Sequence, residues 1–370
     1  MIYATPPIAP ALEERLDELA QLREALGEEL KTPSRWIGSL RREVRARSIG
    51  GSTSIEGFSV SPAEALALTS GRESADRDGE NRQAVACYAQ AMDHVGTMAG
   101  DPSFRWLDRV ILDLHFDACH FQRDKDPGLW RTGPIAVTGP GGALEYRGPD
   151  GSEVASLMAE VVEWLAEGDL EADVVVRAAM AHLHVVSVHP FRDGNGRVSR
   201  IAQSLVLARE GFAAPEFFSI EEYLGSHTPD YYAALREAQG GSYQPRRDAS
   251  GWVGFCVEAH IVQARQRVAQ IERAAARWGH LEELVDARGW PERLVIALEQ
   301  SLHAGSDRGA YGEEAEVSPA TASTDFRRLL DAGLVAQRGR GRNISYVAGE
   351  SLREGLRDEP LPSPERREAR

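Results

Sequence analysis

The stretch His189-Pro-Phe-Arg-Asp-Gly-Asn-Gly-Arg-Val-Ser-Arg200 separates two helical segments of a 370-residue chain. Residues 170–188 before it are apolar almost all round, which predicts a central buried helix. A second helix is predicted from Asn195 to about Glu210. Two glycines in the stretch allow the backbone to turn tightly. The sequence therefore predicts a short loop between two core helices.

This loop carries the groups that a phosphate-binding site needs. The amides in the first turn of the helix at Asn195 lack intrahelical partners, and the helix dipole favours an anion there. Asp193 supplies one oxygen ligand for a Mg²⁺ ion that arrives with phosphates. Arg197 and Arg200 can both reach phosphate oxygens. His189, at the end of the preceding helix, is placed to take a proton from an attacking hydroxyl.

Each of these features is weak alone, because a Gly-rich turn often joins two helices without binding a ligand. Together they match HPFx(D/E)GNGRxxR, the signature of the Fic domain, at every defined position. The chain resembles this family beyond the motif. Residues 104–122, the PGLWRTG turn and a β-hairpin predicted over 134–147 are similar to the Fic core and its flap. The resemblance covers residues 35–245, approximately.

The resemblance implies a role for each residue of the motif. His189 would deprotonate a target hydroxyl, which attacks the α-phosphorus of ATP and displaces pyrophosphate. Asp193 would hold Mg²⁺ between the α- and β-phosphates. The nucleotide would be bound by Gly194, Asn195, Gly196, Arg197 and Arg200. Of these, Arg197 would reach the β-phosphate and Arg200 the γ-phosphate, while the flap would align the target's main chain as an added strand.

A second motif, Ser52-Thr-Ser-Ile-Glu56-Gly57, matches (S/T)xxxE(G/N), the inhibitory motif of many Fic proteins. Its position before the core resembles the group whose inhibitory helix is N-terminal. There Glu56 would pair with Arg200 and occupy the guanidinium that the γ-phosphate needs. The alternative is that Glu56 is an ordinary surface glutamate.

The character of the chain changes near residue 283. A helix is predicted over 291–302 and another after Ser318 as N-cap, followed by two short strands around a basic turn. Helix, helix and β-wing is the order of a winged helix-turn-helix. Gly339–Arg342 would be the wing and Ser318–Leu330 the recognition helix. This helix offers few base-reading side chains, so contact with DNA and contact with protein both stay open.

The expected fold is all-α, mainly the helical Fic fold with a small β-hairpin flap, plus the C-terminal winged helix-turn-helix domain. The predicted parts are an N-terminal helical region over 1–100, a catalytic core over 101–245, a connecting helix over 246–279, the winged helix over 280–348 and a disordered tail over 349–370.

The composition excludes some classes of binding partner. A net charge of −15 argues against nonspecific coating of nucleic acid or anionic membrane. No apolar run approaches about 18 residues, and the N-terminus does not read as a signal peptide, which predicts a cytoplasmic protein without a membrane partner.

The predicted function is a protein adenylyltransferase that is autoinhibited by Glu56. Its substrate would be ATP with Mg²⁺, and its partner a protein with a Ser, Thr or Tyr hydroxyl, this chain itself included. Two alternatives stay open: removal of AMP or transfer of another phosphate-containing group on the same core, and a nucleotide-sensing DNA-binding regulator. A homodimer also stays open.

Overall fold

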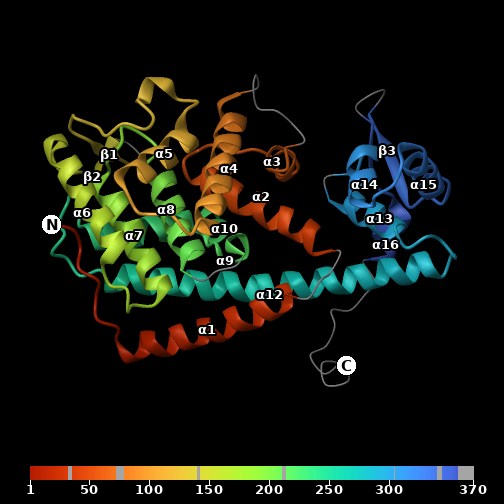
Figure 1. The fold of residues 1–370 in the computed structure, drawn as a ribbon, viewed down its shortest axis with the longest axis horizontal. Helices are drawn as coiled ribbons and strands as arrows, with labels where there is room; N and C mark the ends of the chain where they lie inside the picture. The colour runs from red at the N-terminus through yellow and green to blue at the C-terminus, as the bar shows by residue number, and fades with distance from the viewer. Residues whose placement is uncertain are drawn as a thin grey trace. The chain divides into compact units, whose positions relative to one another are not determined.

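The computed structural model describes residues 1–31, 36–71, 79–139, 142–210, 214–303, 305–339 and 344–356 (Figure 1). The chain divides into two compact units. The first comprises Met1–Gly27 and Val44–Arg265, and the second comprises Glu28–Glu43 and Gln266–Arg370. The predicted mainly helical fold with a small hairpin is confirmed.

The core of the first unit is the antiparallel pair that brackets the motif, α7 (Val174–Val188) and α8 (Asn195–Arg209). All residues of α7 from Val175 onward are buried, so the predicted central buried helix is confirmed. Around this pair, α4 and α5 pack on α8, and α6 packs on α7. These three helices span Gly79–Gly100, Asp108–Cys119 and Val154–Glu167.

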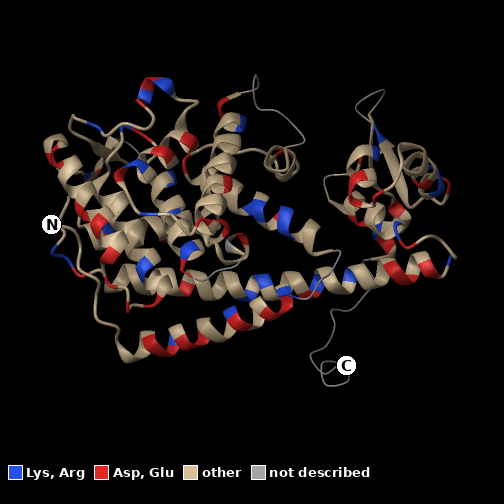
Figure 2. Ribbon diagram, viewed as in Figure 1, with Lys and Arg blue, Asp and Glu red and all other residues tan. Residues whose placement is uncertain are grey.

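Three helices open the chain: α1 (Pro10–Lys31), α2 (Ile37–Ile55) and α3 (Pro62–Thr69). Acidic residues recur along α1 (Figure 2). α2 carries the motif that begins at Ser52 at its C-terminus. Ser61 caps α3: its side chain accepts from the Glu64 amide and forms a capping box with that residue.

The predicted hairpin consists of β1 (Ala136–Thr138) and β2 (Leu144–Arg147), which pair antiparallel with Val137 opposite Tyr146. After α8 the chain continues through α9, α10, α11 and the long helix α12. These span Pro215–Phe218, Glu221–Ser226, Thr228–Gln239 and Ser250–Asp286. Short 3₁₀ helices, η1 (Arg123–Lys125) and η3 (Gly151–Glu153), flank the hairpin.

The second unit contains the helix, helix, strand and strand that the sequence predicts, as α13 (Leu294–Leu302), α15 (Pro319–Asp331), β3 (Val335–Arg338) and β4 (Ser345–Ala348). It also has α14 (Arg308–Glu314), which the sequence did not reveal. The prediction of a disordered tail from residue 349 is wrong for α16 (Glu350–Gly355), because Leu352 buries its side chain. The predicted wing arginines, 340 and 342, and the tail after 356 lie outside the described residues.

A polar and aromatic cluster holds the second unit together. The Asp325 carboxylate is almost fully buried and accepts from Arg293 Nε at 2.8 Å and from the Tyr311 hydroxyl at 2.7 Å. The next residue, Phe326, stacks on Tyr346 with ring centroids 3.9 Å apart.

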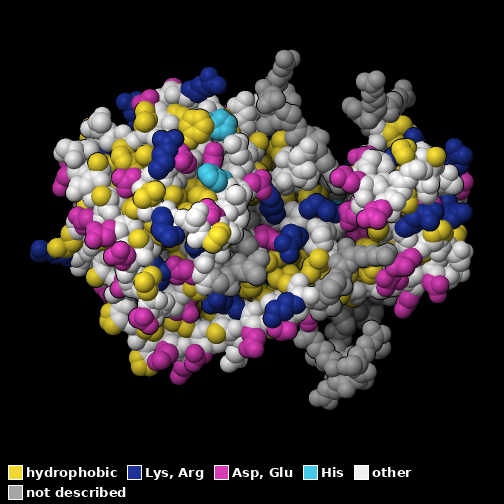
Figure 3. All heavy atoms as spheres, in the orientation of Figure 1, with side chains coloured by type: hydrophobic (Ala, Val, Ile, Leu, Met, Phe, Trp, Pro, Cys, Tyr) yellow, Lys and Arg dark blue, Asp and Glu magenta, His cyan; other side chains and the backbone are white. Residues whose placement is uncertain are grey.

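On the surface, acidic, basic and apolar side chains are interspersed over the face of the first unit that Figure 3 shows. Within the described part of the chain, no helix combines the length and apolar character that crossing a bilayer requires.

Candidate functional site

His189 ends α7 in a left-handed conformation, with φ of 50°. Its Nδ1 donates to the Val186 carbonyl at 3.0 Å, which leaves Nε2 with the lone pair. Arg131, a residue that sequence reasoning missed, fixes the backbone by donating from Nε to the His189 carbonyl at 2.7 Å. Burial lowers the pKa of His189, so the ring is neutral at physiological pH. The ring therefore presents a proton acceptor.

The turn into α8 requires its first glycine. Gly194 is the N-cap of α8 with φ of 76°, and a Cβ there would lie 2.4 Å from Cys119 Sγ. The Asn195 side chain closes the turn: its Oδ1 accepts from the Phe191 amide at 2.9 Å and its Nδ2 donates to the Phe191 carbonyl at 2.8 Å. The Asn195 amide side chain is thus occupied, which leaves its backbone N–H for an anion.

His115, on α5, supports the same turn, and the sequence motif does not include it. Its ring stacks on Phe191, with centroids 3.6 Å apart. The Gly128 amide donates to Nδ1 at 2.8 Å, so the proton is on Nε2, which donates to the Asp193 carbonyl at 3.0 Å. Burial lowers the pKa of His115 to about 4. His115 is therefore a neutral brace for the loop.

A cavity of about 290 Å³ opens beside this turn. Parts that are distant in sequence line it: the end of α2, the flap strands, the motif loop and α11. It contains the predicted site residues Glu56, His189, Asp193, Gly194, Asn195 and Gly196. The tyrosines of α11 also line it, Tyr231 almost fully buried and Tyr232 with 37% of its surface exposed.

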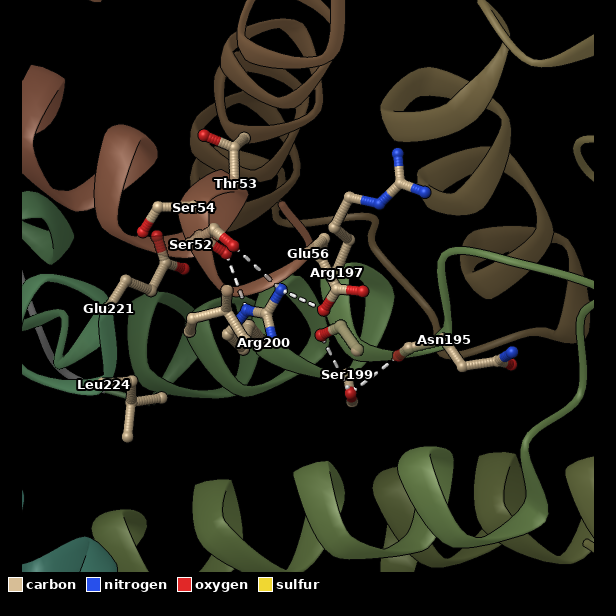
Figure 4. Close-up of polar contacts among 12 residues, drawn as sticks. Ser52, Thr53, Ser54, Glu56, Asn195, Arg197, Ser199, Arg200, Glu221 and Leu224 are labelled. Atoms are coloured by element: carbon tan, nitrogen blue, oxygen red, sulfur yellow. Dashed lines mark hydrogen bonds and ion pairs between the residues drawn. The ribbon is translucent and has the colours of Figure 1, made fainter. Parts of the chain in front are cut away.

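The predicted pairing of Glu56 with Arg200 is present (Figure 4). Arg200 Nη2 lies 2.8 Å from Glu56 Oε1 and 3.1 Å from the Ser52 carbonyl, while Nε donates to Ser52 Oγ at 2.6 Å. Burial acts against the charge of Arg200, yet Glu56 raises its pKa above the ordinary value. Both ends of the motif Ser52–Glu56 thus bind one buried guanidinium, and Gly57 ends the helix with φ of 85°.

Glu56 also lies against the first turn of α8. A Cβ on Gly196 would stand 2.3 Å from Glu56 Oε1. The carboxylate therefore occupies space beside the helix N-terminus, where the sequence predicts a phosphate.

Arg197 differs from the expectation that it faces the phosphates. It is fully buried, and its Nη2 donates to Gln122 Oε1 at 3.0 Å and to Asp193 Oδ2 at 3.2 Å. Its guanidinium lies 5.2 Å from the centroid of the Phe58 ring. Figure 4 shows the side chain extending away from Arg200, and it is not among the described residues that line the cavity. Its contact with a phosphate stays a prediction.

The comparison with known families agrees with the motif. The model of the Fic/DOC family matches residues 106–207. "Protein adenylyltransferase fic-1" of Caenorhabditis elegans is 39% identical over 93 residues, which is 25% of this chain and 17% of that protein. "Protein adenylyltransferase Fic" of Aedes aegypti is 26% identical over 236 residues, 63% of this chain and 44% of that protein. The matched part thus spans less than half the length of each relative.

Solved structures share the fold. A Fic family protein from Desulfovibrio desulfuricans G20 superposes with a TM-score of 0.60 and 18% identity, over 94% of this chain and 98% of its own. Fic-1 (aa134–508) from C. elegans has a TM-score of 0.56 and 21% identity, over 70% of this chain and 72% of its own.

Proposed function

Residues 106–207 form a domain of the Fic/DOC family, and from this premise we propose that the chain transfers AMP from ATP to a hydroxyl of a protein target. One observation carries the proposal. The free Nε2 side of His189, the Asp193 carboxylate and the first turn of α8 meet in one cavity. A base, an oxygen ligand and an anion site are what such a transfer requires.

The proposed reaction begins with His189 Nε2, which takes the proton of the target hydroxyl. The hydroxyl oxygen forms a bond to the α-phosphorus, and the bond from that phosphorus to the bridging oxygen breaks. Pyrophosphate leaves with the electron pair. The amides at the start of α8 stabilise the charge that develops on the phosphates, and they need no reorganisation because Asn195 already fixes the turn.

Asp193 fits a Mg²⁺ ion that the nucleotide brings. Its side chain is 39% exposed and lines the cavity. No group of three or more potential metal ligands occurs among the described residues. One carboxylate completed by phosphate oxygens and water is the usual protein share for Mg²⁺. The ion would neutralise phosphate charge, and Asp193 would hold it.

We further propose that the structure represents the inhibited state. The Glu56 carboxylate binds the Arg200 guanidinium that the γ-phosphate would use and abuts Gly196. A γ-phosphate and this carboxylate are both anions that require the same donor, so they exclude each other.

The test compares Glu56→Ala with wild type in transfer from ATP labelled on the α-phosphate. We expect at least about tenfold more labelled protein, which corresponds to about 1.4 kcal/mol of relieved competition. Glu163→Ala removes an exposed carboxylate on α6 and serves as the matched control, with wild-type labelling expected. Equal labelling by Glu56→Ala and wild type, with equal ATP binding, would contradict the inhibitory role.

Adding His189→Ala to the Glu56→Ala variant separates binding from chemistry. We expect labelling to disappear while a fluorescent ATP analogue still binds, because the variant lacks the imidazole that lines the cavity. Transfer that survives in the double variant would exclude His189 as the base.

The reverse reaction is a second candidate, because Glu56 and His189 line the same cavity. A carboxylate there could orient a water that attacks an AMP-modified target. A target modified by Glu56→Ala would be offered to wild type, and release of AMP that Glu56→Ala cannot perform would support removal. Absence of release by both variants would contradict it.

For the second unit we propose a winged helix that contacts DNA through α15, because Thr324, Arg327 and Arg328 are exposed there. The full chain should bind duplex DNA with an affinity that falls as salt rises, and Arg327→Glu should weaken binding at least about fivefold. Binding to no DNA would leave protein contact as the role of this unit.

A further inference from the structure

Behind Arg200 lies a second carboxylate that the proposed mechanism does not use. Glu221 is the first residue of α10 and is 2% exposed. Its Oε1 accepts from the Tyr88 hydroxyl at 2.9 Å and from Ser204 Oγ at 3.2 Å. Its Oε2 is buried without a hydrogen-bond partner among the described residues. A buried carboxylate with one unsatisfied oxygen is costly, which calls for a reason for its presence.

The surroundings connect Glu221 to the Arg200 site. Ser204, its partner, follows Arg200 by one turn of α8. The inhibitory helix α2 touches the same place, since a Cβ on Gly51 would lie 2.5 Å from the Glu221 carbonyl oxygen. Figure 4 shows the Glu221 and Glu56 carboxylates on opposite sides of the Arg200 side chain. Arg200 is therefore one buried cation with two acidic neighbours.

We propose that Glu221 is a positioning residue whose charge state sets how strongly Arg200 attracts an anion, whether the carboxylate of Glu56 or the γ-phosphate of ATP. The inference rests on the proposed role of Arg200 in binding that phosphate. When Glu221 is protonated, the full charge of the guanidinium acts on the incoming anion. When Glu221 is ionised, it offsets part of that charge from behind.

The environment allows Glu221 to change charge near neutral pH. Burial raises its pKa to about 7, although Tyr88, Arg200 and Ser204 act in the opposite direction. The other groups around it keep their charge over that range. Burial raises the pKa of Tyr88 well above its ordinary value, so Tyr88 stays neutral, and Glu56 raises that of Arg200, so Arg200 stays charged. Ser52, from α2, is uncharged.

Two linked effects follow. An anion that binds Arg200 removes the positive charge that helps Glu221 to ionise, so nucleotide binding draws a proton to Glu221. By the same linkage, raising the pH through the pKa of Glu221 weakens the binding of the γ-phosphate.

The first experiment measures the Kd of ATP for the full-length Glu56→Ala protein and for Glu56→Ala/Glu221→Gln from pH 6 to pH 8. Between pH 6 and pH 8 we expect the Kd of ATP for Glu56→Ala to rise about three- to tenfold more than the Kd for Glu56→Ala/Glu221→Gln. The reason is that an ionised Glu221 would offset part of the Arg200 charge in a buried site. The titration of ATP itself is common to both proteins and cancels. ADP lacks the γ-phosphate, so its Kd should show a smaller difference.

The second experiment needs no nucleotide. The pKa of Glu221 is raised from its ordinary value of 4.5 to about 7 in the folded protein. Its contribution to stability is therefore fully present below pH 4.5 and is lost as the pH rises to about 7. Glutamine cannot ionise. The Tm of Glu221→Gln relative to wild type should therefore increase by a few degrees between pH 5 and pH 8. Glu163→Gln, at an exposed position of α6, is the control and should show no such change.

The outcomes distinguish the two proposals. In one outcome the Tm difference appears, but the Kd of ATP and the Kd of ADP change with pH to the same extent in Glu56→Ala and in Glu56→Ala/Glu221→Gln. Arg200 then does not bind the γ-phosphate, and this part of the proposed function is wrong. If the two Kd profiles for ATP coincide while ADP binds more weakly than ATP, Arg200 keeps its role and the inference about Glu221 is overturned. A Tm difference that is flat with pH also overturns it.

Discussion

At the scale of single residues, the site is defined by how each polar group is already paired. His189 has one ring nitrogen bound to the Val186 carbonyl, and the other has no hydrogen-bond partner among the described residues. Arg131 fixes the backbone that carries the ring. Asn195 belongs to its turn, bound at both ends of its amide to Phe191. Few polar side chains of the motif therefore remain available for a substrate.

The lowered pKa of His189 makes a prediction for the pH dependence of transfer. A group whose pKa is depressed below 6.5 stays neutral, and active as a base, until the pH falls through the lowered value. In the Glu56→Ala variant, kcat should therefore be level from pH 8 down to pH 6.5 and decline below it. Single-turnover labelling at saturating ATP measures this. A decline that begins above pH 7 would show that His189 is not shielded from protonation as the structure indicates.

At the scale of elements, α2 is the part that connects inhibition to the core. Its last turn reaches Arg200, and its Gly51 packs directly on the backbone of α10. A Cβ on Gly225 of α10 would lie 2.6 Å from the Gly51 Cα. This approach is close enough that no side chain fits at position 51. The helix is therefore held by its shape as well as by the Glu56–Arg200 ion pair.

Adjacent glycines in α2 give a matched pair of variants. Gly51→Ala would place its Cβ 2.5 Å from the Glu221 carbonyl oxygen, whereas Gly50→Ala would meet nothing within 4 Å. We expect Gly51→Ala to displace the end of α2, to lower stability by about 1–3 kcal/mol and to raise AMP transfer. Gly50→Ala should leave transfer unchanged and raise stability by up to about 1 kcal/mol. Chemical denaturation and labelling from ATP measure the two effects, and equal behaviour of the pair would contradict the packing.

Elements with strong local signals were predictable. Ser61 and Pro62 mark the start of α3 as a cap and a first-turn proline, and the apolar run of 174–188 marks α7. α14 escaped because its seven residues, Arg308–Glu314, offer only one buried side chain, Tyr311, and no apolar period. α16 escaped for the same reason, since Leu352 alone anchors it.

At the scale of the whole molecule, each of the two units has its own interior. In the second unit, Asp325 lies buried between Arg293 and Tyr311, and Phe326 stacks on Tyr346. In the first unit, residues from the end of α2, the flap, the motif loop and α11 line the cavity. The stability of one unit and nucleotide binding by the other are therefore expected to be separable.

Asp325→Ala tests this separation. Arg293 is 33% exposed, so solvent screens its charge, and the main loss is the hydrogen bond of the Tyr311 hydroxyl. We expect the variant to lose about 1–3 kcal/mol, and this loss should fall on the second unit. Calorimetry should show its thermal transition at lower temperature, while the Kd of ATP for the Glu56→Ala background stays the same. Asp331→Ala, exposed at the end of the same helix, is the control and should change neither. A weakened affinity for ATP would show that the units depend on each other.

The sequence predicts the motif residues of the candidate site, but not the buried residues that contact them. Residues 189–200 and the Ser52–Glu56 motif could be read directly, because their chemistry is encoded in close sequence spacing. The direction of Arg197 depends on Gln122, and the position of Glu221 depends on Tyr88. Such partners are brought together only by helix packing, which no local pattern in a single sequence specifies.

The hydrogen bonds of Arg200 also determine how fast inhibition can be lifted. In the part of the chain that the structure describes, Arg200 donates to the Ser52 hydroxyl, to the Ser52 carbonyl and to the Glu56 carboxylate. Rotating the Glu56 side chain would therefore uncover the guanidinium while α2 stays docked. Side-chain rotations take picoseconds to nanoseconds, whereas helix displacements take microseconds to milliseconds. Only the Glu56 side chain has to move for inhibition to end. The rate of release would therefore be limited by the competition between Glu56 and the γ-phosphate for Arg200, and not by the motion of a helix.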